Sequence, residues 1–87
     1  MATFTIDQLA EAFVEAANES DEINLEYKSI HKLLRSGMSI YDIVTEYDLA
    51  YNMSDLLSDG YYDEESVLEA IKSYNNNDLA DCIKEYL

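Results

Sequence analysis

The sequence predicts an all-α protein, a single small domain of five to six short helices packed around one core. The chain of 87 residues contains no Pro and two Gly, so little in it interrupts a helix. Apolar residues recur at intervals of three and four. With 48% apolar against 28% charged residues, the chain can bury a core despite a net charge of −14. We therefore expect one acidic helical domain over residues 1–87.

The first predicted helix runs from about Ile6 to Asn18. Thr5, followed three residues later by Gln8, forms a capping-box pattern at its start. One face is apolar at helical spacing, with Ile6, Leu9, Ala10, Phe13, Val14 and Ala17. The other side forms a secondary acidic face at strict four-residue spacing, with Asp7, Glu11, Glu15 and Glu19. Such spacing costs an isolated helix roughly 0.2–0.5 kcal/mol per pair, so this face is either simply solvated or used for binding.

A second predicted helix runs from about Asn24 to Ser36 and ends at Gly37, which suits a left-handed C-cap. Its core-facing residues are expected to be Ile23, Tyr27, Ile30, Leu33 and Leu34. It also holds three of the five basic residues, Lys28, Lys32 and Arg35. These cations either compensate the acidic surface internally, which is the simpler interpretation, or form a basic docking patch.

Ser39 is the predicted cap of a third helix, whose Tyr41 faces outward and whose inward residues are Ile40, Ile43, Val44 and Tyr47. A short helix with Met53, Leu56 and Leu57 follows and ends at Gly60. Tyr62 or Asp63 caps a further helix through Tyr74, which buries Val67, Leu68, Ile71 and Tyr74. Asn77 caps the last helix, whose apolar residues are Leu79, Ile83, Tyr86 and Leu87.

The string Leu33-Leu34-Arg35-Ser36-Gly37-Met38-Ser39-Ile40-Tyr41-Asp42-Ile43-Val44, continued to Tyr47, resembles the first helix and lead-in of helix-turn-helix domains. Small antitoxin-like proteins are among these. The segment that would form the recognition helix, residues 50–57, offers Asp55 and no Lys or Arg. A helix in the major groove needs cations against the phosphates. The resemblance therefore implies a shared architecture, and we expect no DNA binding.

The stretch from Met38 to Ile71 contains nine carboxylates, five of the eight tyrosines and no Lys or Arg. Tyrosines among unneutralised charges are typical of interfaces. We therefore predict that the partner-binding residues are Tyr41, Asp42, Glu46, Asp48, Asp55, Asp59, Tyr61, Tyr62, Asp63, Glu64 and Glu65.

The sequence contains no complete catalytic or metal-binding motif. In an EF-hand alignment, Leu57 and Ser66 occupy ligand positions three and twelve, although four other positions match, at Asp55, Asp59, Gly60 and Asp63. The order Ser54-Asp55-Leu56 differs from the Asp-Ser-Leu motif of acyl carrier proteins. Cys82 is flanked by carboxylates that would raise its pKa. We expect no enzyme activity, no cofactor and no metal site.

The charge argues against binding to nucleic acid or to anionic membranes. A single cysteine, the lack of a signal-peptide pattern and the lack of a long apolar run predict a cytoplasmic protein, in the host cell if the protein is phage-encoded. In size, charge and lack of catalytic motifs, the chain resembles phage and mobile-element inhibitors of host defence, of the anti-CRISPR and anti-restriction types.

This resemblance implies an acidic inhibitor that acts as a DNA or RNA mimic. It would bind the basic nucleic-acid-binding surface of a partner protein, such as a CRISPR effector or a restriction enzyme. The alternative is an acidic helical interaction module, antitoxin-like or a regulatory subunit. Such a module would bind one protein through a Tyr-rich patch, with Tyr41, Tyr61 and Tyr62 as its central residues.

Overall fold

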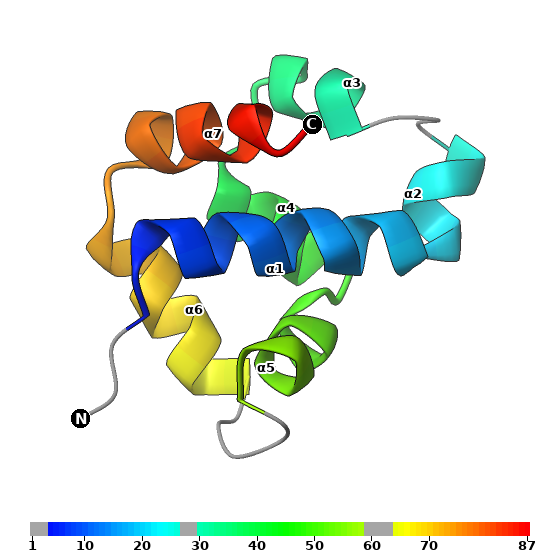
Figure 1. Ribbon diagram of the computed structural model, residues 1–87. Coiled ribbons are helices and arrows are strands. Elements are labelled where there is room, and N and C mark those ends of the chain that lie inside the picture. The colour runs from blue at the N-terminus through cyan, green and yellow to red at the C-terminus, as the bar shows by residue number, and fades with distance from the viewer. Residues whose placement is uncertain (1–3, 27–29, 59–63) are drawn as a thin grey trace.

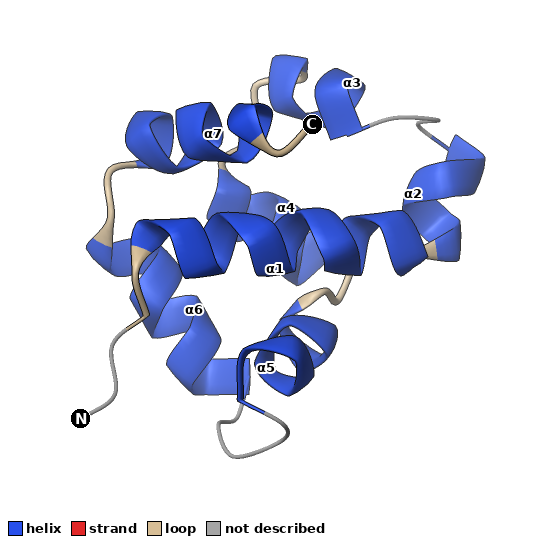
Figure 2. Cartoon of the chain, in the orientation of Figure 1, coloured by secondary structure: helices blue, strands red, loops and turns tan. Residues whose placement is uncertain are grey.

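The computed structural model describes residues 4–26, 30–58 and 64–87, which contain helices and no strand. The helices follow in the order α1 (Ile6–Glu19), α2 (Asp21–Glu26), α3 (Ile30–Arg35), α4 (Ile40–Glu46), α5 (Ala50–Ser58), α6 (Glu64–Ser73) and α7 (Asn76–Glu85), as Figures 1 and 2 show. The all-α prediction is confirmed. Within the described residues the helices number seven rather than five or six.

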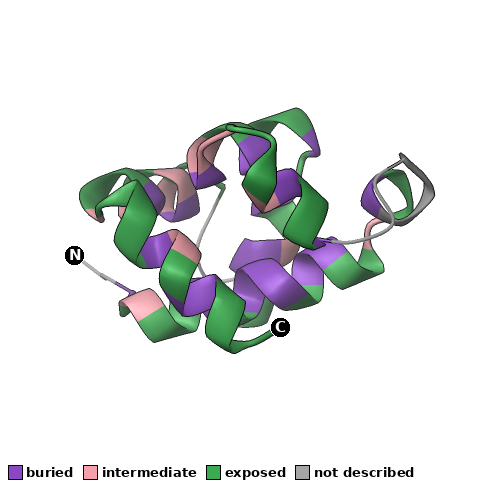
Figure 3. Ribbon diagram, turned by 90° about the horizontal axis from the view of Figure 1, so that it is seen from above, coloured by how far each residue is buried: buried purple, intermediate pink, exposed green. Residues whose placement is uncertain are grey.

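Helix α1 packs against four other helices, α7, α5, α2 and α3. The predicted capping box is present, because the Gln8 backbone N–H donates to the Thr5 hydroxyl at 3.1 Å and the Thr5 N–H donates to the Gln8 side chain at 2.8 Å. In Figure 1, α1 crosses the front of the molecule, with α7 above it and α5 and α6 below. Its buried residues are Leu9, Ala10, Ala12, Phe13, Val14, Ala16 and Ala17, and the broad buried surface of α1 is visible in Figure 3.

The segment predicted as one helix from residue 24 to residue 36 forms two helices, α2 and α3. The chain leaves α1 at Ser20 in an extended conformation, and the Ser20 hydroxyl accepts a hydrogen bond from the Ile23 N–H at 3.4 Å. A serine hydroxyl at this position favours a new helix start, so α2 begins at Asp21. Ile23, Ile30 and Leu33 are buried as expected and Leu34 is half-buried. Tyr27 and Lys28 lie outside the described residues.

Gly37 follows the end of α3 in the left-handed conformation, with φ of +94°, which confirms the predicted C-cap. A Cβ added at Gly37 would meet no atom within 4 Å, so the cost of a side chain there is conformational alone. We expect Gly37→Ala to lower the free energy of unfolding by about 1 kcal/mol in urea titrations. Gly37→Asn should cost less, since Asn tolerates this conformation. Equal stability of Gly37→Ala and the unaltered protein would contradict the conformational argument.

Tyr74 and Asn75 connect α6 to α7, and Asn76 and Asn77 are the first residues of α7. The last helix is capped by Asn75 and not by Asn77 as predicted, because the Asn75 side chain accepts hydrogen bonds from the N–H groups of Asn77 at 2.8 Å and Asp78 at 3.3 Å. The side chain of Asn76 accepts a hydrogen bond from the Ile40 N–H at 2.7 Å. This segment therefore caps α7 and also satisfies a free N–H group at the start of α4.

Helix α4 is capped by Ser39 as predicted, with the Ser39 hydroxyl accepting from the Asp42 N–H at 3.1 Å. The predicted inward residues Ile40, Ile43, Val44 and Tyr47 are buried. The outward placement of Tyr41 is wrong, because Tyr41 is half-buried and the ammonium nitrogen of Lys72 lies 4.8 Å from its ring centroid. A cation over an aromatic face is an attractive arrangement that holds α4 against α6.

The remaining helices bury most of the residues predicted for them. Met53, Val67, Ile71, Leu79 and Ile83 are buried, and the hydroxyl of half-buried Tyr74 donates to the Phe4 carbonyl at 2.5 Å. Three apolar residues of the predicted helices are exposed: Leu56 at 41%, Tyr86 at 43% and Leu87 at 43%. Gly60 and the predicted caps Tyr62 and Asp63 lie outside the described residues.

Candidate functional site

The negative charge of the described surface is almost entirely unneutralised. Every Asp and Glu whose burial the structure describes is exposed. Among the described residues, one ion pair forms, between Lys84 and Asp81 at 3.9 Å, and both side chains are more than half exposed. Such a pair contributes little to stability. The described cations Lys32 and Arg35 on α3 are exposed and form no ion pair with a described carboxylate, so the predicted internal compensation is not seen there.

The secondary acidic face forms a row along the exposed side of α1. We name this set the α1 row; it consists of Asp7, Glu11, Glu15 and Glu19, all exposed. Residues four apart on an α-helix lie about 6 Å apart along its axis. The α1 helix contains no Lys or Arg, so no cation on α1 offsets the row.

Helix α7 adds a second row beside the first. We name this set the α7 row; it consists of Asp78, Asp81 and Glu85, all exposed. In Figure 1, α1 and α7 lie side by side and run in the same direction. A hollow of about 340 Å³ lies where they meet, lined by Ile6, Asp7, Asp78, Asp81, Cys82 and Glu85. The structure therefore brings carboxylates from the two ends of the chain to one surface.

The Cys82 thiol and Asp7 join the two helices. The Cys82 sulfur lies 3.0 Å from a carboxylate oxygen of Asp7, to which it donates a hydrogen bond. Burial, the Asp7 hydrogen bond, and the charges of Asp7 and Glu85 together raise the pKa of the Cys82 thiol to about 11 from an ordinary 9.0. Partial desolvation, followed by the charges of Asp7 and Glu11, also raises the pKa of Tyr86, which places Tyr86 near the α1 row. The thiol is thus a packing and hydrogen-bonding group at neutral pH.

We expect Cys82 to react slowly with iodoacetamide in the folded protein. Raising the pKa from 9.0 to about 11 lowers the thiolate fraction at pH 8 about 100-fold, and the thiolate is the reacting species. Mass spectrometry of timed samples measures the rate, with the urea-unfolded protein as the reference. Asp7→Asn should react faster than the unaltered protein. Equal rates in the folded and unfolded chains would contradict the described environment of Cys82.

The predicted partner-binding residues of the middle stretch do not form one row. The described carboxylates lie on three helices or next to them: Asp42, Glu46 and Asp48 at α4, Asp55 on α5, and Glu64 and Glu65 on α6. All are exposed. Tyr41 is covered by Lys72, and Asp59, Tyr61, Tyr62 and Asp63 lie outside the described residues. Tyr41 is therefore the one described tyrosine of the predicted Tyr-rich patch, and its ring is not fully accessible to a partner.

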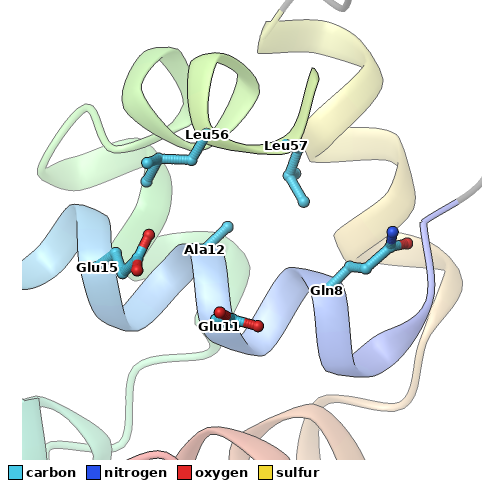
Figure 4. A pocket seen from close by; sticks show the side chains of 6 residues that line it. All are labelled: Gln8, Glu11, Ala12, Glu15, Leu56 and Leu57. Atoms are coloured by element: carbon cyan, nitrogen blue, oxygen red, sulfur yellow. The ribbon is translucent and has the colours of Figure 1, made fainter. Parts of the chain in front are cut away.

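A groove separates α1 from α5, and Figure 4 shows its lining. It has a volume of about 180 Å³ and is lined by Gln8, Glu11, Ala12, Glu15, Leu56 and Leu57. Leu56 and Leu57 project from α5 toward α1, whereas Glu11 and Glu15 stand on α1. The groove could not be predicted from local sequence patterns, because Leu56 and Leu57 face residues of α1 that are far away along the chain. Among the described residues, no three His, Cys, Asp or Glu side chains are placed to hold a metal ion.

No family model, curated protein or solved structure matches this chain. Along the described residues, no helix combines the length and the apolar character that a membrane span requires. The geometry and charge of the surface therefore carry the functional argument.

Proposed function

We propose that this protein is an acidic inhibitor that binds the basic nucleic-acid-binding surface of a partner protein in place of DNA or RNA. The observation that carries the proposal is the pair of exposed carboxylate rows on neighbouring helices, the α1 row and the α7 row. A surface of this kind attracts a cationic groove and repels nucleic acid itself.

The density of charge supports mimicry of a nucleic-acid backbone. Duplex DNA carries about one charge per 1.7 Å of axis over both strands, and a single row spaced by about 6 Å falls short of this density. The two rows meet at Asp7, which lines the hollow together with Asp78, Asp81 and Glu85, and there the local density of charge rises toward that of DNA. The rows are fixed by a packed core and a capped helix, so the charges are held in place before binding.

The partners that fit this proposal are enzymes with a long basic channel for nucleic acid. A CRISPR effector and a restriction enzyme both have that property, and inhibition of either would make the protein an anti-defence factor. Such partners bind through many phosphate contacts, so their affinity for a mimic should fall as salt rises.

The test combines capture and competition. The tagged protein is incubated with a bacterial lysate, with and without excess duplex DNA, and the captured proteins are identified by mass spectrometry. We expect nucleic-acid-binding proteins that are released by DNA and by added salt, while the protein alone fails to shift labelled duplex DNA in a gel. Captured proteins that are insensitive to DNA, or saturable binding to the DNA itself, would contradict the proposal.

A further inference from the structure

The groove between α1 and α5 combines two kinds of chemistry on its two sides. On the α5 side, Leu56 is 41% exposed and Leu57 is half-buried, so an apolar surface faces the opening. On the α1 side, Glu11 and Glu15 are exposed carboxylates, and Ala12 lies between them in the sequence. None of the six described residues that line the groove is a cation. Figure 4 shows that the leucines and the carboxylates border the same opening.

The size of the groove limits its occupant. Small-molecule sites generally have volumes of about 300–1,000 Å³, and this groove has about 180 Å³. A single long side chain fits that volume better than a cofactor. An occupant that matches both sides needs an apolar stem against the leucines and a positive charge near the carboxylates. Lysine and arginine are the side chains with this construction.

Arginine matches the groove better than lysine does. Its guanidinium is planar and weakly hydrated, and it can donate paired hydrogen bonds to a carboxylate. Its charge persists beside apolar groups, whereas a lysine ammonium is strongly hydrated and resists desolvation against Leu56. Charge complementarity and the apolar lining therefore select the same occupant.

We propose that the α1–α5 groove seats an arginine side chain from a basic segment of the partner protein. This inference rests on the proposed function, because it assumes a basic partner. The arginine site would add one specific contact to a surface whose other interactions are long-range attractions between charges. Arginine is one of the residue types enriched at binding hot spots, and an anchored side chain fixes the orientation of a partner in a way that distributed charge does not.

Two short synthetic peptides of identical length and charge test the proposal, one with arginine and one with lysine at every basic position. Fluorescence anisotropy measures the affinity of each peptide for the protein. We expect the arginine peptide to bind at least about fivefold more tightly than the lysine peptide. Leu56→Ala should abolish this preference, and Leu87→Ala should retain it. Leu87 is a matched control because its exposed fraction, 43%, is close to that of Leu56, 41%.

Chemical-shift mapping provides a measurement that needs no variant. Addition of the arginine peptide should shift the amide resonances of Ala12, Leu56 and Leu57 more than those of α4. Equal affinity for the two peptides, an unchanged preference in Leu56→Ala, or shifts centred on α4 would each overturn the arginine site. None of these results depends on competition by DNA, so the arginine site and the proposed function can fail independently.

Discussion

Replacement of Glu11 and Glu15 together by Gln should stabilise the protein. These two residues take part in all three four-residue pairs of the α1 row, with Asp7, with each other and with Glu19. Each like-charge pair costs roughly 0.2–0.5 kcal/mol, so removal of three pairs should raise the free energy of unfolding by about 0.6–1.5 kcal/mol. In a domain of this size, that corresponds to an increase in Tm of about 2–12 °C, measured by circular dichroism.

The same double variant should bind its partner more weakly, by about tenfold or more, because two charges are lost from the α1 row. Asp7 is left unchanged in this design, so the hydrogen bond from Cys82 persists. If the double variant is more stable but binds its partner more weakly, the α1 row serves binding. Carboxylates whose role was to stabilise the fold would not lower its stability.

The matched control is Asp42→Asn with Glu46→Gln, on α4. It removes the same formal charge from two exposed positions. Helix α4 itself is drawn behind α1 in Figure 1. We expect a smaller effect on partner binding. If this control weakens binding more than the α1 variant does, the middle stretch is the binding surface, as the sequence predicted. If neither variant changes the affinity, mimicry by carboxylates is wrong.

Local features of the fold could be predicted because their causes are local. The capping box of α1, the serine cap of α4 and the left-handed Gly37 each depend on residues within a few positions of one another. The start of α2 at Asp21 was missed because the predicted apolar spacing begins at Ile23. The role of Asn76 was also missed, because its partner Ile40 lies 36 positions away in the sequence.

The proposed pairing of carboxylates from α1 and α7 could not be predicted from the sequence for a related reason. The density of acidic residues along the chain predicted a site in residues 38–71, whereas the described carboxylates of that stretch lie on or next to three different helices, α4, α5 and α6. The α7 row lies more than 70 positions from Asp7, and tertiary packing alone brings the two together. The sequence did contain a signal for the α7 row, because Asp78, Asp81 and Glu85 are spaced so that they lie on one face of a helix.

Phe13→Ala should cause the largest loss of stability among these substitutions. Phe13 is fully buried on α1, the helix that contacts α7, α5, α2 and α3. Removal of a buried phenylalanine side chain costs about 3–5 kcal/mol, which is a large part of the roughly 5–15 kcal/mol that holds a domain together. The Tm should fall by more than about 10 °C, measured by circular dichroism or calorimetry.

The control for Phe13→Ala is Tyr86→Ala, which also removes an aromatic side chain but one that is 43% exposed. It should change stability far less, and equal losses in the two variants would contradict the described core. The α1 helix carries both Phe13 and the acidic row, so Phe13→Ala should lose partner binding through unfolding. The Glu11 and Glu15 variant should lose binding while its Tm rises. If Tm falls in Phe13→Ala and rises in the Glu11 and Glu15 variant, while both variants lose affinity for the partner, then the packed face and the binding face of α1 have different roles.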